Sequence, residues 1–363
     1  MNAPAARRAL IMAGGTGGHV IPALSLAKEL RGRGVKVEWL GSPRGIENRL
    51  VPEADIPLHR VVVSGLRGNG IAGWLAVPWR LSRAVWQARR VIADYDPQVV
   101  VGLGGFASGP GGLAAWLMRR PLVIHEQNAL AGLTNRALAK LARRIYAAFP
   151  GAISGRSVQV IGNPVRRDIA ALGEMPRSAE IMRERRLRLL VVGGSLGALA
   201  LNRYLPEALA RLAVEKRPEV FHQAGRDKDA VTRQAYAEQG IEAEVTAFID
   251  DMAVAYDWAD LVVCRAGALT ISELAAAAKP ALLVPYPHAV DDHQTANARV
   301  LLDVEAAQLM PQAGLTAEAL SNRLATLLNP AILAAMASKA RANARLDAIE
   351  RLADGCMEVG FER

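Results

Sequence analysis

The sequence predicts an α/β protein built from two doubly wound parallel sheets, and three observations carry this prediction. Short apolar runs alternate with helical patterns along the whole chain, which is typical of parallel sheets covered by helices on both faces. A basic start, an apolar run, a glycine turn and a helix occur together at residues 7–19 and again at residues 186–197. The length of 363 residues also fits two domains. We therefore expect two similar Rossmann-like domains.

Each half contains a succession of expected strands. In the first half, after the opening strand, we expect them near residues 35–40, 59–63, 98–103, 121–125 and 157–161. In the second half we expect them near residues 218–222, 243–247, 260–264, 280–284 and 305–309.

The domains are expected to comprise residues 1–164 and 165–342, joined near Asn163-Pro164. A last helix at about residues 343–363 is compatible with either domain, including packing back on the first. In folds of this kind ligands bind at the carboxyl ends of the strands. We therefore expect the site there, in the cleft between the two domains.

Composition and charge narrow the class of protein. Residues 1–164 carry 21 Lys/Arg and 8 Asp/Glu, whereas residues 165–363 carry 23 and 27. A basic first half predicts a polyanionic partner, either nucleic acid or an anionic membrane. Two cysteines provide neither a disulfide framework nor a metal-binding spacing, which favours a reducing compartment. We expect no secretory leader and no membrane-spanning helix.

The most informative segment is residues 259–288, where two apolar strands flank a helix expected from about Leu269 to Lys279. The amino end of such a helix offers free N–H groups and a positive dipole end to an anion. Glu273 lies one turn inside, on the face expected to meet a ligand. This pattern suits a nucleotide, with phosphate on the amides and the ribose on the carboxylate. A first-turn glutamate can also simply complement the helix dipole.

A glycine-rich turn at residues 14–18 precedes His19. Glycines allow backbone amides to approach a ligand closely. The spacing differs from the dinucleotide-binding fingerprint, Glu38 lies inside its strand rather than at the end, and no P-loop motif occurs. His19 is a candidate proton acceptor beside a helix amino end, with helix capping as the alternative.

Further polar and glycine-rich segments follow other expected strands. The turn at residues 193–197 could bring Ser195 to a phosphate, although a plain tight turn is the simpler interpretation. The glycine cluster at residues 102–110 could line the same cleft. His125 to Asn128 end one strand and need polar partners. Arg166 could reach a diphosphate, and residues 291–297 suit sugar hydroxyls or plain N-capping.

Residues 70–90 contain three of the six tryptophans among four arginines. Trp79, Arg83 and Trp86 share one helical face by their spacing. Core packing is the usual role of tryptophan, but this pattern in the basic half favours contact with an anionic membrane surface. The expected contact residues are Trp74, Leu75, Trp79, Arg83, Trp86 and Trp116.

Seven spaced motifs, in order along the chain, resemble the MurG family of bacterial peptidoglycan glycosyltransferases. They are Gly14-Gly-Thr-Gly-Gly-His19, His125-Glu-Gln-Asn128, Gly162-Asn-Pro-Val-Arg166, Gly193-Gly-Ser-Leu-Gly-Ala198, Phe248-Ile-Asp-Asp-Met252, Arg265-Ala-Gly-Ala-Leu-Thr-Ile-Ser-Glu273 and Asp291-Asp-His-Gln294. The resemblance runs from about residue 8 to the carboxyl terminus. It implies the GT-B architecture, with an acceptor- and membrane-facing first domain and a donor-binding second domain.

The resemblance also implies an activity. The family transfers N-acetylglucosamine, with inversion, from UDP-N-acetylglucosamine to the C4 hydroxyl of the muramyl sugar of undecaprenyl-pyrophosphoryl-muramoyl-pentapeptide (lipid I), and so forms lipid II. The reaction belongs to cell wall synthesis, cell shape and cell division, and takes place at the cytoplasmic face of the inner membrane. Implied partners are both substrates, an anionic membrane surface and the cell-wall and division machinery, but no nucleic acid. No cofactor and no metal ion are implied.

The matching motifs also imply roles for individual residues of the site. His19 is implied as the general base and Glu273 as the partner of the ribose hydroxyls. Further residues implied to contact the sugar nucleotide are Thr16, Gly17, Gly18, Asn128, Arg166, Ser195, Ile249, Ala268, Leu269, Thr270, Ile271, Ser272 and Gln294. Where some relatives have two adjacent glutamines, this chain has His293-Gln294, so only the second amide carries over.

Three other functions compete with this interpretation. A UDP-N-acetylglucosamine epimerase would share the architecture without needing the tryptophan-rich segment. A nicotinamide-dependent oxidoreductase is disfavoured by the glycine spacing and by Glu38. A non-catalytic basic adaptor would account for the charge but leave the polar motifs without a role.

Overall fold

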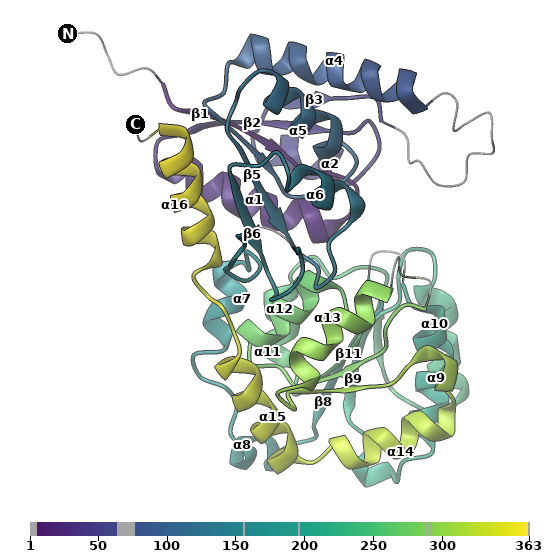
Figure 1. Ribbon diagram of the computed structural model, residues 1–363. Helices are drawn as coiled ribbons and strands as arrows, with labels where there is room; N and C mark the ends of the chain where they lie inside the picture. The colour runs from purple at the N-terminus through teal and green to yellow at the C-terminus, as the bar shows by residue number, and fades with distance from the viewer. Residues whose placement is uncertain are drawn as a thin grey trace. The chain divides into compact units, whose positions relative to one another are not determined.

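The computed structural model describes residues 6–63, 77–154, 157–194, 197–287, 289 and 292–361. The chain divides into two compact units, which we call unit 1 (residues 1–165 and 345–363) and unit 2 (residues 166–344). Each unit is an α/β domain built on one parallel sheet (Figure 1). The predicted fold class is therefore confirmed.

Unit 1 contains a seven-stranded sheet in the order β3-β2-β1-β4-β5-β6-β7, with every pair parallel. Its strands are β1 (Arg8–Met12), β2 (Lys36–Gly41), β3 (Leu58–Arg60), β4 (Val99–Gly102), β5 (Leu122–Glu126), β6 (Arg144–Ala147) and β7 (Gln159–Val160). Its helices are α1 (Gly17–Gly32), α2 (Glu47–Glu53), α4 (Val77–Tyr95), α5 (Ser108–Leu117), α6 (Leu133–Leu138) and α16 (Ala348–Phe361).

Alternate side chains of the central strands of unit 1 enter two separate cores. Ile11 of β1 packs in a cluster with residues of α1 and α16. Its neighbours Leu10 and Met12 pack in a second cluster with residues of α4 and α5. Because successive side chains of a strand point to opposite faces, the sheet is buried on both sides. This burial explains the nearly continuous apolar runs of β1 and β4.

The strand β6 was not predicted from the sequence. Its segment begins with two arginines, Arg143 and Arg144, and has only a short apolar run, so its local pattern is weak. It forms a strand because it pairs with β5 on one side and with β7 on the other. Tertiary pairing here overrides local propensity.

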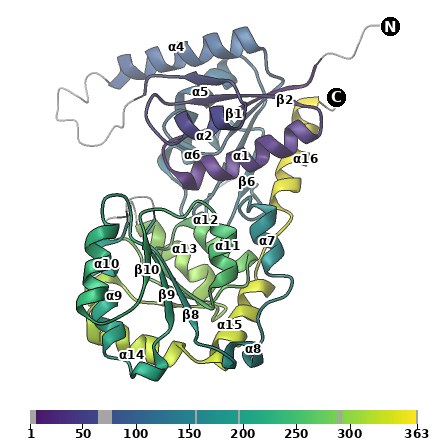
Figure 2. The ribbon, with the colours of Figure 1, turned by 180° about the vertical axis from the view of Figure 1, so that it is seen from behind.

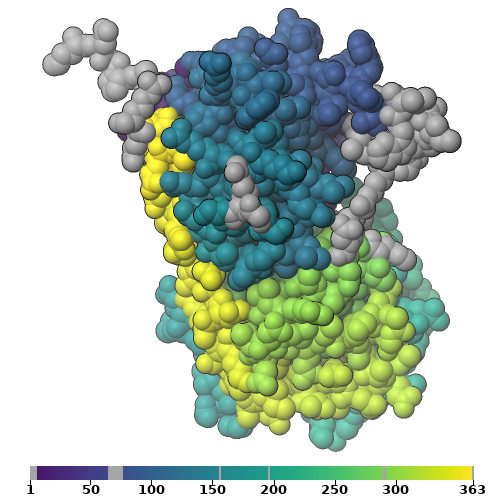
Figure 3. All heavy atoms as spheres, viewed as in Figure 1, coloured from purple at the N-terminus to yellow at the C-terminus, as the bar shows by residue number. Residues whose placement is uncertain are grey.

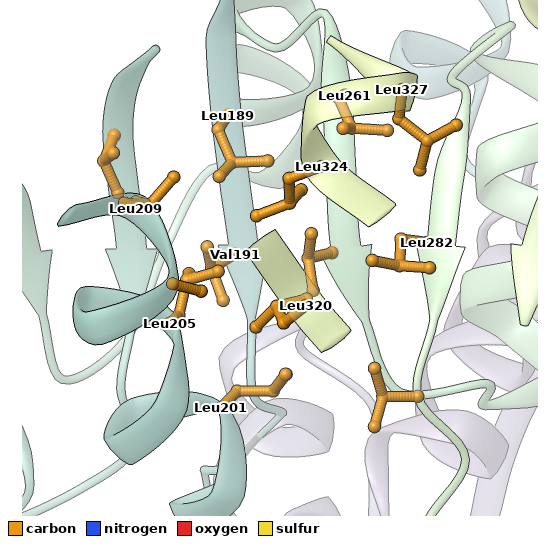
Figure 4. Close-up of a cluster of buried hydrophobic side chains, with 14 of the residues drawn as sticks. Leu189, Val191, Leu201, Leu205, Leu209, Leu261, Leu282, Leu320, Leu324 and Leu327 are labelled. Atoms are coloured by element: carbon orange, nitrogen blue, oxygen red, sulfur yellow. The ribbon is translucent and has the colours of Figure 1, made fainter. Parts of the chain in front are cut away.

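Unit 2 contains a six-stranded parallel sheet in the order β10-β9-β8-β11-β12-β13. Its strands are β8 (Arg188–Val192), β9 (Glu219–Gln223), β10 (Glu244–Thr246), β11 (Leu261–Cys264), β12 (Ala281–Leu283) and β13 (Ala307–Leu309). Its α-helices are α7 (Arg167–Leu172), α8 (Ala179–Arg183), α9 (Leu199–Ala210), α10 (Asp229–Glu238), α11 (Met252–Trp258), α12 (Ala268–Ala276), α13 (His293–Leu302), α14 (Ala317–Leu327) and α15 (Pro330–Ala342). Figure 4 shows its core, where leucines of α9 and α14 pack on β8, β11 and β12.

The helix expected from about Leu269 to Lys279 is α12, which begins one residue earlier and ends at Ala276. The chain leaves the helix through Ala278, which adopts a left-handed conformation with φ of 53°. The prediction placed the end at Lys279, directly before Pro280, because proline blocks continuation of a helix. In the structure the turn into β12 starts before that proline.

The carboxy-terminal helix α16 belongs to unit 1 and packs against α1 (Figure 2). Figure 3 shows the atoms of this helix, in yellow, against other atoms of unit 1. Its side chains Leu352, Ala353 and Cys356 enter the same core as β1 and β4. No helix among the described residues is long and apolar enough to cross a membrane. Cys264 and Cys356 are both buried and free.

Candidate active site

In unit 1 the polar and glycine-rich segments gather at one edge of the sheet. β1, β4 and β5 are neighbours, and the segments at residues 14–18, 103–105 and 126–128 follow them. Carboxyl ends of parallel strands meet at the same edge, so the predicted glycine loops and the polar segment lie together. The N-cap residue of α1, Thr16, is exposed, and its side chain makes no capping hydrogen bond. The amides of Gly17 and Gly18 in its first turn are thus candidates for ligand contact.

His19 lies in the first turn of α1 and is hydrogen-bonded to Gln127. Its Nδ1 is 3.2 Å from Gln127 Oε1, and Gln127 Nε2 donates to the carbonyl oxygen of Leu103 at 2.7 Å. The imidazole is half-buried. The partner of the His19 imidazole is thus a side chain from the segment that follows β5.

The two glycine loops of unit 1 approach so closely that side chains would not fit between them. A Cβ at Gly105 would lie 2.4 Å from the carbonyl oxygen of Gly14, and one at Gly104 would lie 2.7 Å from His19 Nδ1. Both residues have positive φ, 87° and 94° respectively. Glycine is required here both for backbone conformation and for space.

Sequence reasoning missed Glu47, whose side chain is fully buried behind the first glycine loop. Its Oε2 accepts from the amide of Gly15 at 2.9 Å, and its Oε1 accepts from the amide and the hydroxyl of Ser42 at 3.1 and 2.7 Å. A Cβ at Gly14 would lie 2.6 Å from Oε1. Glu47 therefore anchors the loop from behind. Only the glycines at positions 41 and 45, close to it in sequence, hinted at such packing.

Glu126 is a second buried carboxylate at this edge. Its Oε1 accepts from the backbone and side-chain amides of Asn128 at 2.9 and 3.1 Å, and its Oε2 from Asn135 Nδ2 at 2.8 Å. These bonds fix the half-buried Asn128. Nearby, burial lowers the pKa of His125 to about 4, and its Nε2 is 2.8 Å from the carbonyl oxygen of Gly162. His125 is therefore a neutral structural side chain.

In unit 2, Glu273 lies in α12 and is more buried than the sequence suggested, with an exposed fraction of 8%. Tyr256 of α11 donates its hydroxyl proton to Glu273 Oε2 at 3.1 Å. Burial raises the pKa of Glu273 to about 7, while the Tyr256 hydrogen bond and the charge of Arg166 oppose this rise. Ile271 is fully buried, whereas Thr270 and Ser272 are half-buried.

The N-cap residue of α12 is Gly267, which has no side chain with which to cap the helix. The amides of the first turn of a helix, here including Leu269 and Thr270, have no intrahelical acceptor. Arg166 lies at the start of α7, and its charge acts on Glu273. Its Nη2 is buried and has no hydrogen-bond partner among the described residues. A guanidinium with an unused donor, at the start of a helix that packs against α12, suits an anionic group.

The remaining donor-side residues are held largely by backbone contacts. Gln294 Oε1 accepts from the amides of Tyr286 and Ala266 at 2.8 and 3.3 Å, which leaves its Nε2 as the group able to meet a sugar. Ile249 is buried in the loop after β10. Ser195 and Asp291 lie outside the described residues.

The Gly193-Gly194 turn after β8 is held by Gln223, a residue that sequence reasoning also missed. Gln223 Oε1 accepts from the amide of Gly194 at 3.0 Å, and its Nε2 donates to the carbonyl oxygens of Gly194 and Ala247 at 3.1 and 2.9 Å. Gln223 thereby links the loops that follow β8 and β10.

The tryptophans of α4 and α5 are exposed rather than packed in the core. Trp79, Trp86 and Trp116 have exposed fractions of 75%, 56% and 50%. The opposite side of α4 provides Ala84, Val85, Ala88 and Ile92 to the core. The guanidinium of Arg90 stacks over the Trp86 ring at 4.5 Å. Trp74 and Leu75 lie outside the described residues.

Among the described residues, no group of three or more His, Cys, Asp or Glu side chains is arranged to hold a metal ion. Unit 2 presents a helix amino end that follows a glycine, a guanidinium and a buried carboxylate, which are the elements of a nucleotide site. Unit 1 presents glycine loops and an imidazole. Two such α/β units with these elements define the class of GT-B glycosyltransferases.

Comparisons with known proteins agree with this class. Residues 9–147 match the glycosyltransferase family 28 N-terminal domain, and residues 188–352 match the family 28 C-terminal domain. The chain therefore belongs to glycosyltransferase family 28.

Individual relatives indicate which enzymes of this family the chain is similar to. The chain is 72% identical over 352 residues to the UDP-N-acetylglucosamine–N-acetylmuramyl-(pentapeptide) pyrophosphoryl-undecaprenol N-acetylglucosamine transferase of Chromohalobacter salexigens, covering 97% of each chain. It is 56% identical to the enzyme of the same name from Azotobacter vinelandii, covering 96% of this chain and 98% of the other. Among solved structures it is similar to Acinetobacter baumannii MurG, with a TM-score of 0.83, 42% identity and coverage of 97% of this chain and 99% of the other.

Proposed function

We propose that the chain catalyses the reaction for which these relatives are named: transfer of N-acetylglucosamine from UDP-N-acetylglucosamine to the muramyl sugar of lipid I. The observation that carries this proposal is the 72% identity to the Chromohalobacter enzyme along 97% of both chains. The acceptor group is the C4 hydroxyl, the linkage forms with inversion, and the product is lipid II.

Unit 2 is proposed to bind the donor. The amino end of α12, which follows Gly267, and the unused donor of Arg166 suit the diphosphate. Glu273 would accept hydrogen bonds from the ribose hydroxyls, and Ile249 would meet uracil through its backbone. Gln294 Nε2 and Asn128 would contact the N-acetylglucosamine, near the amides of Gly17 and Gly18.

Unit 1 is proposed to activate the acceptor. His19 takes the proton of the attacking hydroxyl as that oxygen bonds to the anomeric carbon. UDP leaves with the electron pair of the broken glycosidic bond, and the helix amides and Arg166 stabilise its negative charge. This assignment needs no metal ion or cofactor. Catalysis in the expected cleft between the domains stays a prediction.

The exposed tryptophans of α4 and α5 are proposed to contact the membrane that holds the lipid acceptor. Trp79, Trp86 and Trp116 are exposed on the basic unit, and Arg83 on the same helix is exposed as well. Aromatic rings suit headgroup depth, and arginines suit anionic lipid. On this proposal the enzyme works at the cytoplasmic face of the inner membrane, beside the cell-wall and division machinery.

The deciding experiment measures radiolabelled sugar transfer from UDP-N-acetylglucosamine to a short-chain lipid I analogue. We expect a labelled disaccharide product from the wild type and a loss of about 10²–10⁴-fold in kcat for His19→Ala at saturating substrates, because general-base catalysis contributes that much. Near-normal turnover of His19→Ala would eliminate the base assignment. Formation of an epimerised sugar nucleotide in the absence of acceptor would instead support the epimerase alternative.

A further inference from the structure

We propose that Gln127 is a positioning residue that holds His19 in the tautomer with its proton on Nδ1, leaving Nε2 free to accept a proton. The inference rests on the proposed role of His19 as general base. It adds to that role a reason why the imidazole of His19 adopts a single tautomer.

The orientation of the Gln127 side chain is determined by its surroundings. Gln127 has an exposed fraction of 1%. One end of its carboxamide is 2.7 Å from the carbonyl oxygen of Leu103, where only an N–H donor can be accommodated. The other end, 3.2 Å from His19 Nδ1, must therefore be the carbonyl oxygen. Asn163 Nδ2 donates to the backbone carbonyl of Gln127 at 3.2 Å and holds the same residue from the backbone side.

The tautomer of His19 follows from this orientation. An amide oxygen can only accept, so Nδ1 must carry the hydrogen of this bond. A neutral imidazole has one N–H, so Nε2 retains its lone pair. Gly104 lies against the ring on the Nδ1 side, where a Cβ would be 2.7 Å from that atom. The Nδ1 side is thus occupied by the protein, and Nε2 is the atom available for the acceptor hydroxyl.

A neutral hydrogen-bond partner of His19 has a different electrostatic effect from a carboxylate in the same position. A carboxylate would stabilise the imidazolium form and raise the pKa of the base. Gln127 orients the ring without adding charge. The buried carboxylates and histidine on the described surrounding elements are Glu47 of α2 and His125 and Glu126 of β5, whereas Arg49 and Glu53 of α2 are exposed. The hydrogen bond to the imidazole comes from the neutral Gln127.

Two variants test the inference through the pH dependence of kcat. Gln127→Met keeps the side-chain length but not the hydrogen bonds, so we expect kcat to fall at least about tenfold, yet less than in His19→Ala. Gln127→Glu keeps an acceptor oxygen for Nδ1 and adds charge, but it loses the N–H donor to the carbonyl oxygen of Leu103. We expect it to recover part of kcat and to move the acid limb of the profile to higher pH, because the imidazolium is stabilised.

A double-mutant cycle separates positioning from a general structural defect. If Gln127 acts through His19, Gln127→Met should not lower the residual rate of His19→Ala any further. Gln98→Met is the matched control, since Gln98 Oε1 accepts from the amide of Arg8 at 2.7 Å at the amino end of the same sheet. It should leave kcat unchanged.

The outcomes distinguish this inference from the function on which it rests. Near-normal turnover of His19→Ala overturns the base assignment and the role of Gln127 together. An inactive His19→Ala combined with unchanged kcat in Gln127→Met overturns only the role of Gln127. Equal losses from Gln127→Met in the wild-type and His19→Ala backgrounds likewise overturn positioning in favour of folding.

Discussion

Buried carboxylates at the carboxyl ends of the two sheets are stabilised by neutral donors. Glu47 accepts from a backbone amide of the glycine loop and from Ser42, and Glu273 accepts from Tyr256. Asp260, at the opposite end of its sheet, is instead paired with Arg177 and Arg185. A carboxylate with neutral partners keeps its charge uncompensated, so its ionisation and its removal have measurable consequences.

The first prediction concerns Glu273 and pH. Its pKa is raised from 4.5 to about 7 in the folded chain, so the native state holds a proton that the unfolded state has released. Stability from this group is present below about pH 4.5 and is lost as pH rises toward 7. We therefore expect Glu273→Gln to gain stability relative to the wild type between pH 5 and pH 7, measured by urea unfolding without ligand.

A stability difference that is independent of pH would contradict this prediction.

The role of Glu273 in donor binding is tested separately in the transfer assay. Glu273→Ala should raise KM for UDP-N-acetylglucosamine, and an unchanged KM would rule out the proposed contact with the ribose.

The second prediction concerns Glu47. Glu47→Ala leaves the amides of Gly15 and Ser42 without their acceptor in a buried space, so we expect a loss of about 3 kcal/mol in the free energy of unfolding. Urea unfolding measures the loss. Glu53→Ala, at the exposed end of the same helix, is the matched control and should change stability by less than about 0.5 kcal/mol. Equal stabilities for the two variants would show that the loop does not depend on Glu47.

At the scale of elements, the helix α4 has one buried face and one exposed face. Its buried side chains are small or aliphatic, such as Ala84 and Ile92, whereas Trp79 and Trp86 are exposed. Contact of large apolar side chains such as tryptophan with water is unfavourable, and apolar patches of this kind mark interaction sites. The face therefore indicates an interaction with something other than water.

The third prediction tests this face. Trp79→Gln combined with Trp86→Gln should weaken binding to vesicles of anionic phospholipid by at least about tenfold, because each buried aromatic side chain contributes roughly 1.5–3 kcal/mol. Activity on a water-soluble acceptor should stay unchanged. Val231→Gln, which removes an apolar side chain with an exposed fraction of 72% from α10, is the control. Undiminished vesicle binding by the double variant would show that the lipid contact lies elsewhere.

At the scale of the whole molecule, the carboxy-terminal segment returns to the unit in which the chain begins. Gly355 of α16 allows this close packing, since a Cβ there would lie 1.8 Å from the hydroxyl oxygen of Tyr146. Tyr146 is itself almost fully buried in β6. The sheet of unit 1 thus depends on residues that follow unit 2 in sequence.

The fourth prediction is that Gly355→Ala destabilises unit 1 selectively, by about 1–3 kcal/mol, because overpacking forces the helix away from the sheet. Hydrogen exchange should accelerate in β4 and β5 while β8 and β11 keep their protection. Gly32→Ala in α1 is the control, because a Cβ there meets no atom within 4 Å. Equal protection of unit 1 in both variants would contradict this dependence on α16.

Local sequence signals were sufficient for much of the fold and for part of the candidate site. The strands β1, β4, β8 and β11 were predictable because strands buried on both faces read as continuous apolar runs. The glycine turns at residues 14–18 and 193–194 were recognisable because their backbone geometry requires glycine. His19 and Glu273 could be named because each belongs to a helix that follows a glycine turn, although Glu273 lies in the second turn of α12 and not in the first as expected.

Other features depend on contacts between segments that are distant in sequence. The strand β6 forms because β5 and β7 pair with it, Glu47 meets a loop 32 residues away, and Gln127 meets an imidazole 108 residues away. No local pattern encodes such distances, since hydrogen bonds form wherever the fold brings donors and acceptors together. The sequence alone thus determined the class of fold and which residue types the chemistry uses. Only the tertiary structure decided how Glu273 is buried, which tautomer His19 adopts and to which unit α16 belongs, because packing and hydrogen bonding are settled by neighbours in space.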